Sequence, residues 1–427
     1  WITIQLVRRS NAPRGWLRGG AALIGVAVIV LAFGLLRLLN TTSSNNESAT
    51  LSPTPAIVSM GQGQERLTVL LAGTSRRPGG ETSVEMVMLF GLDPAARTAH
   101  LLSIPPELYV PLPGRSPGFL STAYVAGSAD YLRQAVEFNF GFLVPYHAII
   151  AAEAMIALID LSSGVTIYNS REINAIVDGE PLTLGIGWHM LDGRKALHYA
   201  RIAQSADSFG QVFEQMQRQQ QLMLAMHANL LTTNAAEKLL PQLSQILSAL
   251  QSSIETNLSA DAISRLVLAA KQVPQENVTL LALDAASTQI WNTSESLAVL
   301  VPNRAAVRDL RERFLSSTSL QASATSATTA EDSGTVRIQN GTQRRGLAAA
   351  TRDYLQRRGI TVAEIGNAPQ AYARSVIVDY RNRPRFTQRL ANELGLPLSS
   401  IAVAVDTAQA VDALIVLGDD YTLPQRP

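Results

Sequence analysis

Two arginines, Arg201 and Arg218, are the first candidates for chemistry in this sequence. They stand at the edges of apolar segments within residues 187–221, and an irregular polar segment separates them. A guanidinium carries a permanent charge and five N–H donors in a planar fork, a geometry that matches a phosphate group. The two arginines therefore predict a shared site for an anionic, phosphate-containing ligand. The alternative is that both are ordinary helix-surface residues, because most arginines are exposed.

The residue types support few other chemistries. The five histidines show neither the H-x-x-x-H nor the H-E-x-x-H spacing of zinc sites, and the chain contains no cysteine. No P-loop and no G-x-S-x-G motif occurs, so nothing in the sequence supports a nucleotide-driven enzyme or a serine hydrolase. The 35 lysines and arginines nearly balance the 34 aspartates and glutamates, so the charge predicts no nucleic-acid partner.

The segment around Arg201 resembles a known family. Residues 191–201, L-D-G-R-K-A-L-H-Y-A-R, are similar to the "LnGeqALaYaR" signature of the LytR-CpsA-Psr family, and residues 218–221, R-Q-Q-Q, are similar to its following R-Q-Q. Members of this family are membrane-anchored, extracytoplasmic proteins that transfer glycopolymers from a polyprenyl-pyrophosphate carrier to the bacterial cell wall. The resemblance implies that Arg201, Arg218 and Gln219 bind the pyrophosphate.

A second motif lies earlier in the chain. Residues 71–77, L-A-G-T-S-R-R, resemble the family's L-x-G-[ST]-D-x-R, with Ser75 at the aspartate position and Arg77 at the arginine position. The resemblance implies that Arg77 is catalytic and that Arg76 and Arg77 both bind phosphate. Ser75 is a neutral residue at a position where the family has a carboxylate.

A third motif supplies the candidate metal ligand. Residues 83–89 resemble the family's R-x-D-T-M-x-L, with Ser83 at the arginine position and Glu85 at the aspartate position. The resemblance implies that Glu85 is catalytic and binds metal. Mg²⁺ prefers hard carboxylate oxygens in near-octahedral geometry, so Ser75 is a poor ligand, and the longer side chain of Glu85 displaces its carboxylate. Mg²⁺ is therefore a doubtful cofactor.

Further departures remove positive charge. Residues 103–110 resemble the family's S-I-P-R-D-x-Y-V, with Pro106 at the arginine position and Glu107, implied to be catalytic, at the aspartate position. Ala203 stands where Y-A-R-Y-R has its second arginine, and Gln215 stands at the first position of R-x-x-R. Prearranged positive charge stabilises a phosphoryl group during transfer, so these losses predict a degenerate active site.

The surrounding pattern predicts an α/β (α+β) layered domain over residues 65–315, with a mixed sheet flanked by helices. Apolar runs bounded by Gly and Pro predict buried strands. These runs are residues 67–73, 85–94, the stretch ending at Pro105, 165–168 and 278–283. Helical patterns occur at residues 128–139, 147–160, 211–232, 235–252 and 260–272.

The helical pattern at 147–160 is apolar nearly all round and predicts a buried helix. In a family-like fold, this segment and residues 222–232 would line a pocket for a polyprenyl chain. Their residue types are equally well explained by an ordinary hydrophobic core.

The N-terminal part predicts a membrane anchor. Residues 19–36 contain no charge, and the apolar segment extends to residue 39, long enough for a span of about 20 residues. Four arginines precede it within residues 1–18, so the positive-inside rule places that segment in the cytoplasm and the bulk of the chain outside. A cleaved signal peptide is the alternative. Residues 40–64 are small and polar, and predict a flexible linker.

Residues 316–334 are rich in Ser, Thr and Ala and predict a second flexible linker. Strand and helix patterns resume after it. Residues 335–421 alternate predicted strands and helices and predict a small α/β domain. Its beginning, V-R-I-Q-N-G-T-Q-R-R-G-L, and its ending, A-L-I-V-L-G-D-D-Y, resemble the LytR C-terminal domain. This region offers no catalytic constellation, which favours a binding or scaffolding role.

Two hypotheses follow for function. The first is a single-pass LytR-CpsA-Psr protein of the cell membrane that acts in glycopolymer assembly with a weakened active site. Its partners would be the lipid bilayer, a polyprenyl-pyrophosphate-linked glycan and a cell-wall polymer. The second is a non-catalytic protein that binds the envelope or the lipid-linked glycan. A transcription regulator conflicts with the predicted location outside the cell and with the balanced charge.

Overall fold

The structure of the 427-residue chain is a computed structural model. It describes residues 66–76, 80–161, 163–232, 253–258, 277–316, 333–381, 383–403 and 409–424, together with a few single residues between 262 and 273.

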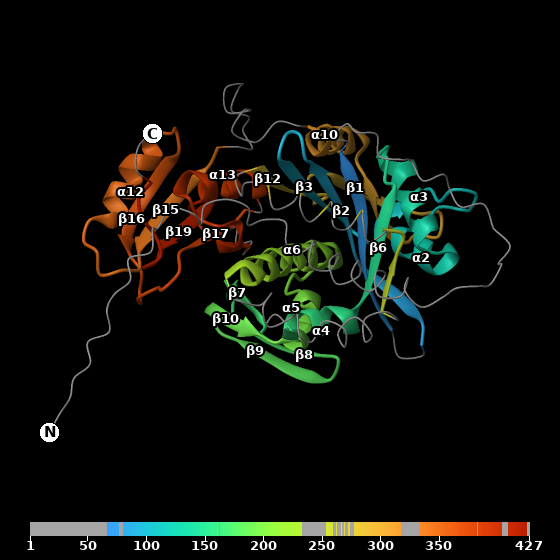
Figure 1. Ribbon diagram of the computed structural model, residues 1–427, viewed down its shortest axis with the longest axis horizontal. Coiled ribbons are helices and arrows are strands. Elements are labelled where there is room, and N and C mark those ends of the chain that lie inside the picture. The colour runs from blue at the N-terminus through green and yellow to red at the C-terminus, as the bar shows by residue number, and fades with distance from the viewer. Residues whose placement is uncertain are drawn as a thin grey trace, which may run out of the picture.

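A six-stranded mixed sheet forms the centre of the larger part of the molecule (Figure 1). The three central strands are antiparallel neighbours, and the next strand on either side runs parallel to its neighbour. In order across the sheet, the strands are β11 (Ile254–Thr256), β6 (Tyr146–Ala151), β1 (Leu67–Arg76), β2 (Thr82–Asp93), β3 (Thr98–Ile104) and β12 (Val278–Ala282).

Both faces of this sheet are buried. Successive side chains of a strand point to opposite faces, so Leu70 and Ala72 of β1 join one hydrophobic cluster while Val69 and Leu71 join another. The strands therefore consist of nearly continuous apolar runs, as strands covered on both faces do.

Helices cover the two faces (Figure 1). On the face of Leu70, the first cluster contains residues of α2 (Leu120–Gly127), α3 (Ala129–Phe140) and α10 (Arg304–Leu315). On the face of Val69, the second cluster contains residues of α6 (Ser208–Thr232) and of α13 (Pro384–Leu394) from the C-terminal region. Two shorter helices, α4 (Ala152–Leu161) and α5 (Gly193–Arg201), pack together and on α6.

Four antiparallel strand pairs surround this framework. Two of them lie below α6 in the view of Figure 1. The pairs are β7 (Val165–Asn169) with β10 (Gly187–Leu191), β8 (Ile173–Val177) with β9 (Glu180–Leu184), β4 (Tyr109–Val110) with β5 (Gly118–Phe119), and β13 (Thr288–Asn292) with β14 (Ala298–Pro302).

The C-terminal region contains its own five-stranded mixed sheet. The sequence predicts alternating strands and helices in this region, and the structure contains both. Across the sheet, the strands are β16 (Thr361–Asn367), β15 (Thr335–Asn340), β19 (Ala413–Leu417), β17 (Val376–Asp379) and β18 (Ile401–Val403), accompanied by α12 (Leu347–Gln356) and α13.

Polar contacts join the C-terminal region to the rest of the molecule, and two of them are hydrogen bonds to main-chain oxygens. The side-chain amide of Gln388 donates to the main-chain oxygen of Leu280 at 3.3 Å, which connects α13 to β12. The indole N–H of Trp188 in β10 donates to the main-chain oxygen of Arg374, also at 3.3 Å.

The structure confirms the predicted mixed sheet flanked by helices and corrects one element. Residues 147–160 do not form a single helix, because Tyr146–Ala151 is strand β6 and only Ala152–Leu161 is helix α4. β6 is buried between β1 and β11, so its apolar residues show no alternation, and periodicity cannot distinguish such a strand from a buried helix. The predicted helix at 235–252 lies outside the described residues, as does most of that at 260–272.

The predicted anchor also lies outside the described residues, since residues 1–65 are not among them. Within the part of the chain that the structure describes, no helix has the length and apolar character needed to cross a membrane.

Candidate functional site

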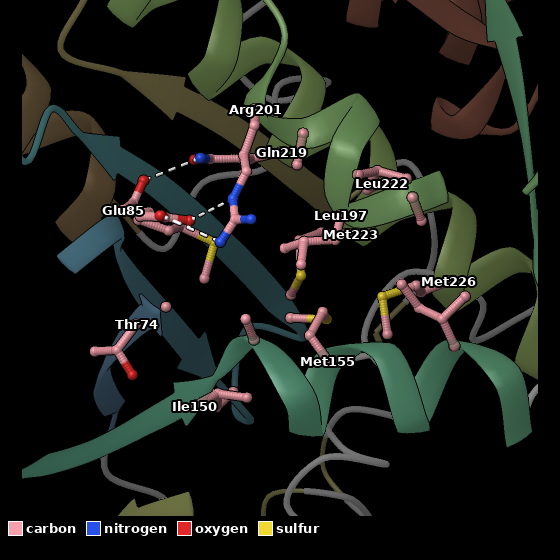
Figure 2. A pocket seen from close by; sticks show the side chains of 16 residues that line it. Thr74, Glu85, Ile150, Met155, Leu197, Arg201, Gln219, Leu222, Met223 and Met226 are labelled. Carbon is pink, nitrogen blue, oxygen red and sulfur yellow. Dashed lines mark hydrogen bonds and ion pairs between the residues drawn. The ribbon is translucent and has the colours of Figure 1, made fainter. Parts of the chain in front are cut away.

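A cavity opens where the ends of β1, β2 and β6 meet the helices α4, α5 and α6 (Figure 2). It contains about 610 Å³ of empty space, including open solvent at its mouth. Its polar lining comes from Thr74, Glu85, Arg201 and Gln219. The larger apolar side chains of the wall are Met86, Ile150, Met155, Ile159, Leu197, Leu222, Met223 and Met226. The cavity is thus apolar over most of its wall and charged at one end.

Arg201 is the cationic group of this site. Its Nε donates to Oε2 of Glu85 at 2.9 Å and its Nη2 donates to Oε1 at 3.2 Å, so the carboxylate receives two bonds from one edge of the guanidinium (Figure 2). Nη1 donates to Oδ2 of Asp178, at the turn between β8 and β9. Two carboxylates therefore face one positive charge, and the group as a whole is negative.

Glu85 is held from two further sides. Ser75 donates its hydroxyl hydrogen to Oε1 of Glu85, and the side-chain amide of Gln219 donates to the main-chain oxygen of Glu85 at 3.0 Å. The pairing of β1 with β2 shifts register between Gly73 and Thr74, next to this contact. Such irregularities locally redirect side chains. The two sequence departures, Ser75 and Glu85, are thus direct partners in the fold.

The motif L-D-G at residues 191–193 starts the helix that carries Arg201. Asp192 is the N-cap of α5 and accepts a hydrogen bond from the main-chain N–H of Lys195 at 2.8 Å. At Gly193, an added Cβ would lie 2.3 Å from the main-chain oxygen of Ile156 in α4. The glycine therefore permits the close approach of α5 to α4 that places Arg201 at the cavity.

Replacing Gly193 with alanine is expected to destabilise the fold by about 1–3 kcal/mol, because the backbone of α4 has to move away from the new methyl group. Thermal unfolding followed by circular dichroism measures the effect. Gly185→Ala is the matched control, since a Cβ there meets no atom within 4 Å. Equal melting temperatures for the two variants would contradict this account of the close approach.

Arg218 does not line the cavity. Its guanidinium carbon lies 4.8 Å from the centre of the Tyr199 ring, and its Nη2 donates to Oε1 of Gln204 at 3.1 Å. Burial lowers the pKa of Arg218 and raises the pKa of Tyr199. The predicted arrangement, in which Arg201 and Arg218 line one site, is therefore not present in this conformation.

The structure places the other predicted residues as follows. Gln219 lines the cavity beside Glu85, whereas Arg76 and Glu107 are exposed and are not among the lining residues. Arg77 lies outside the described residues. The catalytic and phosphate-binding roles of all these residues stay predictions.

The described residues do not fit a magnesium site as they are arranged. Both oxygens of Glu85 accept hydrogen bonds from Arg201, and Ser75 donates to one of them. No group of three or more His, Asp or Glu side chains gathers with metal-binding geometry in the described part of the chain. A divalent cation needs several hard oxygen ligands, and here the carboxylate is engaged with a cation already.

Sequence reasoning missed Asp178. The pattern Asp-Gly between two short apolar segments is a signal for a tight hairpin turn. Nothing in the sequence, however, indicates that this turn folds back onto Arg201, 23 residues further along the chain.

Comparisons with known proteins agree with this architecture. The profile of the LytR_cpsA_psr family matches residues 35–312, and that of the LytR cell envelope-related transcriptional attenuator matches residues 333–421. Protein gbs0355 from Streptococcus agalactiae has a similar fold, with a TM-score of 0.50 and 18% identity over 58% of this chain and 86% of its own.

Two curated relatives are also similar. The regulatory protein MsrR of Staphylococcus aureus (strain COL) is 25% identical over 185 residues, 43% of this chain and 54% of its own length. The polyisoprenyl-teichoic acid–peptidoglycan teichoic acid transferase TagU of Oceanobacillus iheyensis is 25% identical over 210 residues, 48% of this chain and 62% of its own length. The chain thus spans less than two thirds of either relative.

Proposed function

Because the chain belongs to the LytR-CpsA-Psr family, we propose that it binds a polyprenyl-pyrophosphate-linked glycopolymer in cell-envelope assembly and transfers it at a reduced rate. The cavity beside Arg201 carries the proposal. One charged end and a long apolar wall are what a pyrophosphate joined to a prenyl chain requires. The name of TagU, a teichoic acid transferase, supports this class of substrate.

The apolar wall suits a flexible chain. Four of its side chains are the methionines Met86, Met155, Met223 and Met226. Methionine is unbranched and adapts its shape to an irregular partner. The two segments proposed for a lipid pocket, within 147–160 and 222–232, both contribute to this wall. A prenyl chain would fill the cavity while the pyrophosphate meets Arg201.

The charged end of the cavity is the reason for proposing a reduced rate of transfer. An attack on the pyrophosphate needs positive charge that stabilises the leaving phosphate. Arg201 is the one arginine among the described lining residues, and the two carboxylates of Glu85 and Asp178 exceed its single positive charge. In the active complex, Arg201 would orient the phosphate nearest the glycan, and Glu85 would accept the proton of an acceptor hydroxyl.

The proposed location follows from the sequence. Residues 19–39 would anchor the chain in the cell membrane, with residues 1–18 in the cytoplasm and the cavity outside. The linker 40–64 would let the cavity reach lipid headgroups. Fusing a reporter enzyme that works only outside the cytoplasm to the C-terminus tests this orientation, and a silent reporter would contradict it.

The function is tested by titrating the full-length chain in detergent with farnesyl pyrophosphate, farnesol and inorganic pyrophosphate. We expect farnesyl pyrophosphate to bind most tightly, because only this ligand engages the charged end and the apolar wall together. Isothermal titration calorimetry measures the three affinities. Equal affinities for farnesyl pyrophosphate and farnesol would contradict a role for the charged end.

A second candidate, a non-catalytic binder of the lipid-linked glycan, is favoured by the contacts of Glu85. Both of its oxygens accept hydrogen bonds from Arg201, so in this conformation the carboxylate serves to hold the guanidinium. Incubating the chain with a lipid-linked glycan and a peptidoglycan acceptor distinguishes the two candidates. Transferred product supports the slow transferase, whereas binding without product supports the binder.

A further inference from the structure

We infer that Asp178 is an internal competitor for the pyrophosphate, which the ligand displaces from Arg201 when it binds; this inference rests on the proposed function. Asp178 belongs to none of the motifs discussed above. Its Oδ2 accepts a hydrogen bond from Nη1 of Arg201, the end of the guanidinium that Glu85 does not engage. A carboxylate and a phosphate make the same kind of bond to a guanidinium. The two anions therefore compete for the same donor.

The turn between β8 and β9 holds Asp178 at its tip, where the side chain reaches Arg201. Val177 pairs with Glu180, so Asp178 and Gly179 form a two-residue connection between β8 and β9. Both have positive φ, 53° at Asp178 and 82° at Gly179, which is the type I′ hairpin turn. The side chain of Asp178 therefore projects from the tip of a hairpin onto a helix that lies 23 residues further along the chain.

Of the two carboxylates bound to Arg201, Asp178 is the one that a ligand displaces more readily. Its side chain is 57% exposed, compared with 34% for Glu85. Glu85 receives two bonds from Arg201 and one from Ser75, whereas Arg201 donates a single bond to Asp178. The side chain of His198 adds only a distant contact, 3.8 Å from Oδ2 of Asp178. Asp178 is thus the more exposed of the two carboxylates and is held to Arg201 by one bond, so this pair is weaker than the pair with Glu85 and is more readily screened by salt.

Displacement of Asp178 from Arg201 would change the net charge next to the bound pyrophosphate. With Asp178 in place, Arg201 faces two carboxylates, so the group carries a net negative charge that repels pyrophosphate. When the side chain swings into solvent, Nη1 becomes available to a phosphate oxygen. Asp178 therefore weakens the binding of any pyrophosphate, and a ligand without a prenyl chain has no apolar contacts that offset this cost.

The test compares Asp178→Asn with Glu180→Gln in the full-length chain, titrated with farnesyl pyrophosphate. Asparagine keeps the size of the side chain and suits the type I′ turn, so the hairpin should fold. Glu180 lies on the other side of the same turn and pairs with Arg194 at 3.4 Å, so its replacement removes one charge without touching Arg201. We expect Asp178→Asn to bind about 3- to 10-fold more tightly than wild type, and Glu180→Gln to stay within about twofold.

The salt dependence of the affinity tests the inference independently. The advantage of Asp178→Asn should shrink as the salt concentration rises from about 50 mM to about 500 mM, because screening weakens the competing charge. Equal affinities for the two variants would overturn the inference and leave the proposed function standing. Weaker binding by Asp178→Asn would show that Asp178 helps to hold the ligand, and would also overturn it. No binding by wild type or by either variant would reject the proposed function and, with it, the competitor.

Discussion

Replacing Arg201 with alanine is expected to lower the affinity for farnesyl pyrophosphate about 100-fold. Removing one partner of a hydrogen-bonded charge pair costs about 2–5 kcal/mol, largely because the remaining charge loses its partner. In this site, the loss leaves Glu85 and Asp178 facing the pyrophosphate without a balancing cation. Isothermal titration calorimetry on the full-length chain measures the change.

The matched control for this variant is Arg194→Ala. Arg194 lies on the same helix, is exposed, pairs with Glu180, and does not line the cavity. Its replacement should change the affinity by less than about twofold, as expected for a surface ion pair. If both variants bind within about threefold of the wild type, the cavity is not the site of the pyrophosphate.

The second large effect concerns the stability of the fold at low pH. His100 of β3 is buried, with 3% of its surface exposed, and its ring lies 6.0 Å from that of Phe314 in α10. Burial, assisted by the charge of Arg66, lowers the pKa of His100 from 6.5 to about 4. The unfolded chain therefore takes up a proton below about pH 6.5 that the folded chain takes up only near pH 4.

Neutral His100 contributes to the free energy of unfolding. This contribution is fully present above the pKa of His100 in the unfolded chain and is lost as the pH falls toward 4. The loss amounts to about 3 kcal/mol across this window. Urea unfolding at several pH values measures it, and NMR titration of the ring reports the pKa directly. His100→Gln should show a smaller decrease over this range, although His147, whose pKa burial also lowers, adds to the slope in both proteins. Parallel curves for wild type and variant would contradict the assignment.

The fold could be predicted from the sequence where local signals are strong. Apolar runs bounded by glycine and proline mark β1, β2 and β3, and the helical repeat marks α3 and α6. The prediction was wrong at β6, where Ile149 and Ile150 are buried in the interior of the sheet. An apolar run that is buried on both faces shows no alternation, so only the neighbouring strands reveal its conformation.

The site was predictable only in part, for a different reason. Resemblance identified Arg201, Glu85 and Gln219, and the structure brings these three together at the cavity. It also suggested Arg218, whose side chain instead packs over Tyr199. Asp178 was missed, because a hairpin tip that crosses to another element leaves no pattern in neighbouring residues. Motifs locate a side chain along the chain, whereas its partners depend on tertiary packing.

Oxidation of the methionine wall would change the chemistry of the proposed site. The chain has no cysteine, and four of its eight methionines, Met86, Met155, Met223 and Met226, line the cavity beside Arg201. Oxidation converts a flexible thioether into a polar sulfoxide. Under the proposed function, oxidation would weaken lipid binding at this site while Arg201 stayed chemically intact. The repair of methionine sulfoxide, rather than of any thiol, would restore the protein.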